Sequence, residues 1–137
     1  MIKVLELYPL IMEAFSNDKT FSMPIKGTSM QPLLHTNDIV ELSKIDKIKK
    51  NDIIFYKRVD GSFVLHRVYK IKDSKITMIG DHQLVFEENV EPSACFAKVV
   101  SITKNNKKKK LKGFKYGLYV FSLRFFLIRR LYLKCLH

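Results

Sequence analysis

Apolar residues near the N-terminus recur at the spacing of a helix. Within residues 2–16 they fall at i, i+3 and i+4 positions, which place them on one helical face. They are Val4, Leu5, Tyr8, Ile11, Met12 and Phe15. Pro9 lies inside this pattern, so we expect the helix to be kinked or to begin late. Such a helix could pack on the domain or lie on a membrane surface, and the pattern allows both interpretations.

The pattern then changes to short apolar runs separated by turn signals. We expect strands at residues 20–26, 39–42, 53–57, 63–71, 76–79 and 96–103. Asp60-Gly61 predicts a tight hairpin, and Gly80–Gln83 is expected to be a loop. Several short strands with a turn about every ten residues predict a mainly β domain, either a sheet or a small barrel.

The last part of the chain has a different composition. Residues 104–112 are expected to form a basic linker, because they contain the run Lys107–Lys110. Residues 114–133 are apolar and aromatic, with Arg124 near the centre, and they predict a helix. The expected organisation is therefore an N-terminal amphipathic helix at 1–19, a β domain at 20–103, and a linker with a membrane-seeking helix at 104–137.

The net charge of the 137-residue chain is +12, which favours an anionic partner. The apolar character of residues 114–133 favours an anionic membrane surface over nucleic acid. These residues could form an in-plane helix, a span, or a helix packed on the domain or a partner. A span would have to bury Arg124, which costs roughly 2.5–3.5 kcal/mol. We therefore expect membrane association, with no nucleic-acid partner.

Cysteine and histidine spacing gives no sign of a cofactor. Cys95 and Cys135 are far apart and match no zinc spacing, so we interpret them as free thiols. A zinc site built from His35, Asp81 and His82 is a remote alternative without a metal signature. The N-terminal region also lacks the pattern of a signal peptide, because acidic residues interrupt its apolar run.

Residues 23–34 contain the first candidate for catalysis. Ser29 follows Gly27 on an expected turn and is flanked by apolar residues. A constrained turn can expose a serine hydroxyl and direct backbone N–H groups toward one point, as a nucleophile requires. Ile25, Met30 and Leu33 could line an apolar pocket beside it, or could belong to the core.

A serine nucleophile needs a base, and the candidates are the four histidines. His66 lies in the middle of an expected strand, on an otherwise apolar face. A core histidine bonded to the backbone would give the same pattern. Asp81 follows in the next loop, which completes the order Ser29, His66, Asp81.

Four segments in this order resemble the type I signal peptidases. They are Gly27–Pro32, Asn51–Phe55, Val64–Val68 and Gly80-Asp81. The bacterial branch of that family has lysine at the position of His66. The endoplasmic-reticulum and archaeal branch has histidine there, so this chain is similar to the histidine branch. The resemblance covers about residues 20–103 and implies a signal-peptidase-like β-sheet or barrel domain.

The resemblance also implies roles for individual residues. Ser29 would attack the scissile carbonyl, and its backbone N–H would donate to the oxyanion. His66 would be the general base, and Asp81 would orient it. Glu87 stands where the family often has a second acid, and is the alternative to Asp81.

Some positions depart from the family pattern. Part of the family has serine at the position of Gly27, where it adds an oxyanion donor. Asparagines commonly follow the Gly-Asp motif, whereas this chain has His82-Gln83, which weakens the assignment of Asp81. The usual N-terminal spanning helix is not found in this sequence.

These features predict a membrane-associated serine endopeptidase that removes signal or leader segments from secreted precursor polypeptides. Two alternatives remain open. One is a non-catalytic membrane-bound module that retains the fold. The other is a self-cleaving peptidase of the repressor type, although that class uses lysine as its base.

Overall fold

A computed structural model describes residues 4–125 and residue 129. Two α-helices, eight strands and one short 3-10 helix make up this part of the chain. In order they are α1 (Val4–Ser16), β1 (Phe21–Pro24), β2 (Ile39–Ser43), β3 (Ile53–Lys57), β4 (Phe63–Lys72), β5 (Lys75–Ile79), β6 (Glu87–Val90), the 3-10 helix η1 (Pro92–Ala94), β7 (Cys95–Lys104), β8 (Lys107–Lys110) and α2 (Phe114–Ser122).

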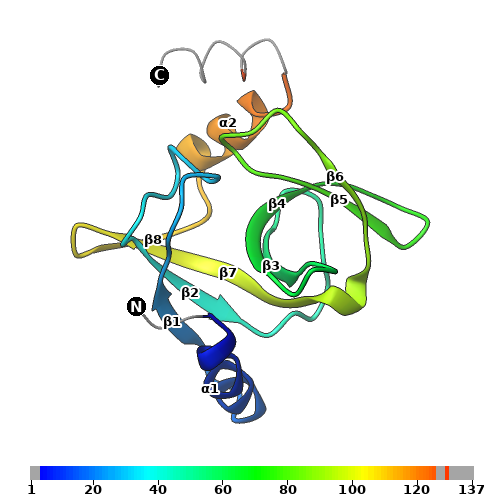
Figure 1. Cartoon of the computed structure of the whole chain (residues 1–137). Coiled ribbons are helices and arrows are strands. Elements are labelled where there is room, and N and C mark those ends of the chain that lie inside the picture. Colours follow the sequence, from blue (N-terminus) through cyan, green and yellow to red (C-terminus); the bar gives the residue numbers. More distant parts are fainter. Residues whose placement is uncertain (1–3, 126–128, 130–137) are drawn as a thin grey trace.

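The strands form one antiparallel sheet in the order β1-β2-β7-β3-β4-β5-β6, with β8 paired to β7. The sheet is strongly curved, with α1 near one end of the molecule and α2 near the other (Figure 1). Bulges in β2, β3 and β4 accompany the curvature, as expected where a sheet bends sharply. The predicted mainly β fold with an N-terminal and a C-terminal helix is confirmed.

Two apolar clusters lie on opposite faces of β3, because successive side chains of a strand alternate. Ile53 and Phe55 belong to the larger cluster, which also contains Ile11 and Phe15 of α1. Ile54 and Tyr56 belong to the smaller cluster, with the β5 side chains. The larger cluster explains why α1 forms despite Pro9: its apolar face packs on the domain.

Residues 104–112, expected to be a linker, instead extend the sheet. Asn105 and Asn106 have positive φ angles of 50° and 64° and form the turn of a hairpin. Lys107–Lys110 then pair with Ser101–Lys104 of β7. All four lysine side chains are exposed, so the charge that suggested a linker remains in solvent at the sheet edge. The strand β6 is also absent from the sequence-based expectation.

The helix α2 turns polar side chains inward. Its residues Tyr116 and Tyr119 hydrogen-bond to groups on the sheet domain. Three large apolar side chains of α2 and one that follows the helix face outward, between 46% and 81% exposed. They are Phe114, Leu118, Phe121 and, just past its end, Phe125. No helix in the described part of the chain has the length and apolarity needed to cross a membrane. Cys135 and most of residues 126–137 lie outside the described residues.

Candidate active site

Ser29 lies in a loop that leaves β1 and returns to β2. The loop is closed at its base, where Ile25 N–H donates to Asp38 O and Asn37 N–H donates to Ile25 O, both at 2.9 Å. Gly27 has a φ angle of 109°, a conformation that favours glycine. This backbone requirement accounts for the glycine two residues before Ser29, where part of the resembling family has serine.

The Ser29 loop rests on the turn formed by residues 80–83. His82 N–H donates to Ser29 O at 2.9 Å. A Cβ atom on Gly80 would lie 2.4 Å from Ser29 O, so only glycine permits this approach. The structure therefore brings together the predicted nucleophile loop and the Gly80-Asp81 motif, which are more than fifty residues apart in sequence.

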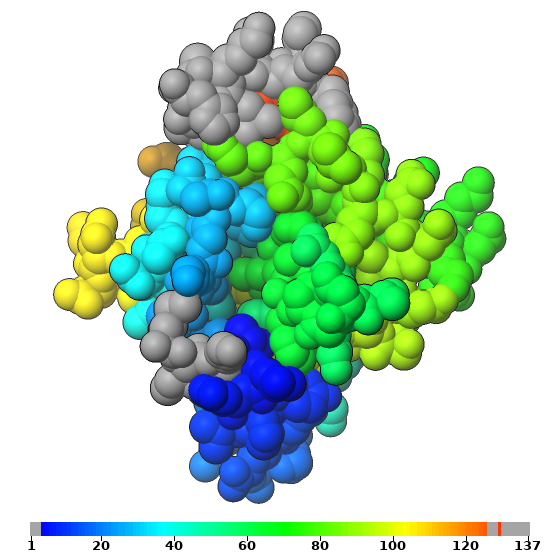
Figure 2. Space-filling model, viewed as in Figure 1, coloured from blue at the N-terminus to red at the C-terminus, as the bar shows by residue number. Residues whose placement is uncertain are grey.

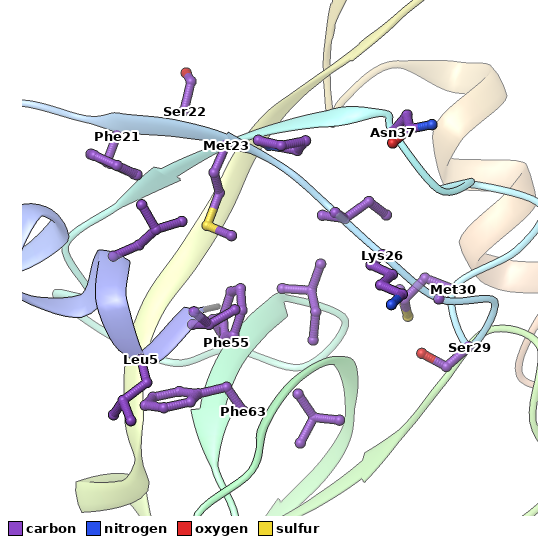
Figure 3. A pocket seen from close by; sticks show the side chains of 17 residues that line it. Leu5, Phe21, Ser22, Met23, Lys26, Ser29, Met30, Asn37, Phe55 and Phe63 are labelled. Atoms are coloured by element: carbon purple, nitrogen blue, oxygen red, sulfur yellow. The ribbon is translucent and has the colours of Figure 1, made fainter. Parts of the chain in front are cut away.

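Ser29 lines one end of an apolar pocket of about 700 Å³. Figure 3 shows Lys26, Ser29 and Met30 at that end, and Leu5, Phe21, Met23, Phe55 and Phe63 further along. In Figure 2 the contributing segments, in dark blue, light blue and green, lie together on the face shown. Two predicted wall residues, Ile25 and Met30, line the pocket, whereas Leu33 packs against the larger apolar cluster.

His66 is buried in the β4 strand and faces away from the larger cluster. Its Nδ1 atom lies 3.2 Å from the Tyr56 hydroxyl and 4.0 Å from Glu87 Oε2. Burial lowers the pKa of His66 to about 4, although the Glu87 carboxylate opposes that shift. The ring is therefore neutral at pH 7. Its Nε2 atom is buried and has no hydrogen-bond partner among the described residues.

Asp81 is paired with a different residue. Its two carboxylate oxygens accept bonds from Nε and NH2 of Arg67, each at 2.8 Å, and Oδ2 also accepts from the Tyr119 hydroxyl at 2.8 Å. Within the described residues, no hydrogen bond joins Asp81 to His66 or His66 to Ser29. Asp81 affects His66 only through its charge, which favours the protonated ring.

The turn at residues 80–83 is also held by a residue from the C-terminal segment. Arg129 is buried, and its NH1 group donates to the carbonyl oxygens of Gly80, Asp81 and Gln83 at 2.8–3.2 Å. A basic residue assigned from sequence to a membrane-seeking tail thus contacts the turn that supports Ser29. No sequence signal indicates this long-range contact.

Two further residues near His66 are not among the candidates predicted from the sequence. Tyr56 faces the same side of the sheet as His66, and Arg58 binds Glu87. The position of Tyr56 could have been found from sequence: the Asp60-Gly61 hairpin pairs Ile54 with His66, so Tyr56 shares the face of His66.

The described residues contain no group of three or more His, Cys, Asp and Glu side chains that could hold a metal ion. His35, one member of the remote zinc set, lies instead beside Lys104, with its Nδ1 atom 3.2 Å from the lysine Nζ. His82 contacts Ser29 through its backbone.

The chain is a mainly β protein that carries Ser29 on the loop between β1 and β2. Residues 4–100 match the family described as Peptidase S24-like, so the chain belongs to that family and, at this level, to the serine peptidases. The family includes repressor-type proteins and relatives of signal peptidase I. The comparison with curated proteins gave no match.

Proposed function

We propose that the protein is a membrane-associated serine endopeptidase that cleaves signal or leader segments from precursor polypeptides. Ser29 is the nucleophile and His66 is the general base. The observation that supports this most directly is the setting of the two residues. Ser29 stands at the end of an apolar pocket, and His66 is held neutral with a buried Nε2 atom that has no hydrogen-bond partner in the described part of the chain.

In this reaction Ser29 Oγ forms a bond to the scissile carbonyl carbon while its proton moves to His66 Nε2. The imidazolium then gives that proton to the leaving amine nitrogen as the peptide bond breaks. A water molecule then attacks the carbonyl carbon of the serine ester and gives a proton to His66 Nε2. The imidazolium returns this proton to Ser29 Oγ as the acid product leaves. The Ser29–His66 hydrogen bond would form as substrate binds, because catalytic hydrogen bonds are often long or poorly aligned in the free enzyme and tighten only when substrate is bound.

The pocket supports an apolar, extended substrate. Its lining comes from α1, β1, the Ser29 loop and the β3–β4 hairpin and is mostly aliphatic or aromatic. β1 stands at the end of the strand order, so an extended peptide could pair with its outer edge while side chains enter the pocket. Signal peptides supply an apolar region before a cleavage site of small residues.

The test is cleavage of a peptide that carries an apolar segment followed by Ala-x-Ala. Wild-type protein is compared with Ser29→Ala, His66→Ala and Lys26→Met. We expect the first two substitutions to abolish cleavage and Lys26→Met to retain it. Lys26 lines the same end of the pocket. Lys26→Met therefore tests whether a lysine, the residue that the bacterial signal peptidases have at the position of His66, acts as the base in this protein. Activity in His66→Ala that is lost in Lys26→Met would overturn the histidine assignment.

Self-cleavage is the second candidate function, because the family includes repressor-type proteins. Incubation of purified chain followed by intact-mass measurement separates the two. A Ser29-dependent loss of intact chain, with no cleavage of added peptide, would favour self-cleavage. If neither reaction occurs and Ser29→Ala also leaves the cellular phenotype intact, the non-catalytic module would stand.

Membrane association is supported by the outward face of α2. Phe114, Leu118, Phe121 and Phe125 are exposed at helical spacing, and the four lysines of β8 add exposed positive charge. An anionic membrane surface complements both features, because apolar rings enter the headgroup region and cations bind lipid phosphates. We call the four exposed apolar residues Phe114, Leu118, Phe121 and Phe125 the α2 stripe.

Sedimentation with lipid vesicles tests this part of the proposal. We expect the protein to pellet with vesicles that contain anionic lipid and to do so far less with neutral vesicles. A Leu118→Ser, Phe121→Ser double variant should lose binding, whereas Val59→Ser, at an exposed hairpin, should not. Equal binding by all three proteins would show that the α2 stripe is not the contact surface.

A further inference from the structure

The polar groups around His66 form a chain that ends at a guanidinium group. Arg58 donates from Nε to both oxygens of Glu87, at 3.0 and 3.1 Å, and from NH2 to Oε2 at 2.9 Å. The Tyr56 hydroxyl donates to the same Oε2 atom at 2.8 Å. The oxygen of that hydroxyl lies 3.2 Å from His66 Nδ1.

The direction of each hydrogen bond in this chain is fixed by the charge of Glu87. Burial alone would raise the pKa of Glu87, but the bonds from Arg58 and Tyr56 outweigh it and lower the pKa. Glu87 is therefore a carboxylate, which only accepts hydrogen bonds. Burial and the Glu87 carboxylate raise the pKa of Tyr56, so its hydroxyl keeps its proton.

A neutral tyrosine has one proton to donate, and Glu87 receives it. The contact between Tyr56 and His66 then requires that Nδ1 carries a hydrogen and donates to the hydroxyl oxygen. A neutral imidazole has only one N–H group, so Nε2 must hold a lone pair. This is the tautomer that can accept a proton from a serine hydroxyl.

Asp81 does not supply this function by direct contact. Both of its carboxylate oxygens are bonded to Arg67, and one also accepts from Tyr119. Glu87 does not contact His66 at hydrogen-bond distance either, since its nearest oxygen is 4.0 Å from Nδ1. The Tyr56 hydroxyl is the group that lies between them.

We propose that Tyr56 is the positioning residue for His66. Glu87 and Arg58 hold the Tyr56 hydroxyl in the orientation that keeps the proton of the His66 ring on Nδ1 and leaves Nε2 unprotonated. The tautomer of His66 does not depend on the proposed function, because it exists without substrate. The catalytic role of Tyr56 does rest on the proposed function. During the reaction, the imidazolium would face the Tyr56 oxygen and, beyond it, the Glu87 carboxylate.

Nitrogen NMR of the histidine ring tests the inference directly. We expect the Nδ1–H form of His66 in wild-type protein at pH 7. Tyr56→Phe, which removes only the hydroxyl oxygen and its hydrogen, should shift the ring toward the Nε2–H form. Tyr116→Phe is the matched control, because that hydroxyl accepts from Arg67 instead. An Nε2–H ring in wild type, or an unchanged Nδ1–H ring in Tyr56→Phe, would overturn the inference.

Kinetics with a cleavable peptide supply the second readout. Tyr56→Phe should lower kcat by at least about tenfold with little change in KM, because the ring remains but its tautomer is wrong. Glu87→Gln retains an acceptor for the tyrosine proton, so the Nδ1–H form should persist. The loss of the carboxylate should move the acid limb of the kcat/KM profile to lower pH, since that charge raises the His66 pKa.

The two readouts separate the failure of the inference from the failure of the proposed function. A tautomer change without any peptide cleavage in wild type would leave the inference standing and remove the peptidase proposal. Cleavage by wild type and Tyr56→Phe at equal rates would remove the positioning role. Urea unfolding of each variant identifies any loss of activity that follows from unfolding.

Discussion

Two arginine–carboxylate–tyrosine groups in this protein have the same chemistry and different surroundings. In one, Asp81 binds Arg67 and Tyr119, and in the other Glu87 binds Arg58 and Tyr56. The first ion pair is closed off from water, with side-chain exposures of 3% and 0%. The second is open, with exposures of 37% and 30%.

Burial makes the Asp81–Arg67 pair structural, whereas the more exposed Glu87–Arg58 pair can act on a neighbouring group. Burial alone would lower the pKa of Arg67, but the adjacent Asp81 carboxylate outweighs it and raises the pKa. Breaking such a pair leaves a buried charge without a partner. The Glu87 pair can exchange partners with water, so its charge is available to stabilise a protonated His66.

The tyrosines extend the comparison to other parts of the chain. Tyr119 belongs to α2, so the Asp81 group fastens the C-terminal helix to the turn that supports Ser29. Tyr56 belongs to β3 and leads to His66. One group therefore joins segments of the fold, and the other ends at the proposed base.

Asp81→Asn should produce the largest effect. The side chain keeps its size, but Arg67 is left buried without a counter-charge, so we expect a loss of about 3–5 kcal/mol in the free energy of unfolding. Glu87→Gln is the matched change in the open pair and should cost less than about 1 kcal/mol. Urea unfolding at pH 7 measures both.

Equal losses in these two variants would show that burial does not distinguish the two groups. A second variant, Asp81→Leu combined with Arg67→Met, removes both charges together. It should recover part of the lost stability, because the penalty comes from the unpaired charge and not from the absence of the pair.

Acid should destabilise the protein through His66 over a defined pH range. The unfolded histidine titrates near pH 6.5, whereas burial lowers the folded pKa to about 4. As the pH falls from 6.5 toward 4, the unfolded state gains a proton that the folded state does not take up. The free energy of unfolding should therefore fall by roughly 3 kcal/mol over this range. Above pH 6.5 this group has no effect.

Unfolding curves measured from pH 7 to pH 4 test this expectation. His66→Gln is the control, because its side chain does not titrate, and it should remove most of the pH dependence above pH 5. Carboxylates such as Glu87 and Asp38, whose folded pKa values are lowered, add their own losses at lower pH. An unchanged slope in His66→Gln would mean that other groups control acid stability.

The sequence predicts most of the strands and the candidate residues, but it does not predict which side chains Asp81 and Glu87 bind. Local apolar runs and turn signals suffice for most strands, and Ser29, His66 and Asp81 become candidates through their order along the chain and the family resemblance. The order alone suggests that Asp81 orients His66. Arg67 follows His66 in β4, so its side chain lies on the face opposite to His66. On that face Arg67 forms an ion pair with Asp81.

Other parts of the site depend on contacts between distant segments. Glu87 lies in β6, a strand without the apolar alternation that identifies strands, so neither the strand nor its contact with Tyr56 is predicted. Tyr119 and Arg129 come from a stretch whose composition suggests a membrane contact. Only the folded chain shows that its polar residues face the protein.

Tyr119→Phe should produce the smallest of these effects. The change removes one hydroxyl donor from Asp81 and leaves both bonds from Arg67, so we expect a loss of about 1–2 kcal/mol in the free energy of unfolding. Because this bond fastens α2, hydrogen exchange should accelerate in residues 114–122 more than in the sheet.

A double-mutant cycle with Asp81→Asn tests whether the loss comes from this bond. If Tyr119 acts through Asp81, the double variant should lose less stability than the two single losses together, by about 1 kcal/mol. Additive losses would place the effect of Tyr119 elsewhere in the α2 contact. The His66 ring should keep its Nδ1–H form in Tyr119→Phe, because only the tyrosine of the open group reaches the base.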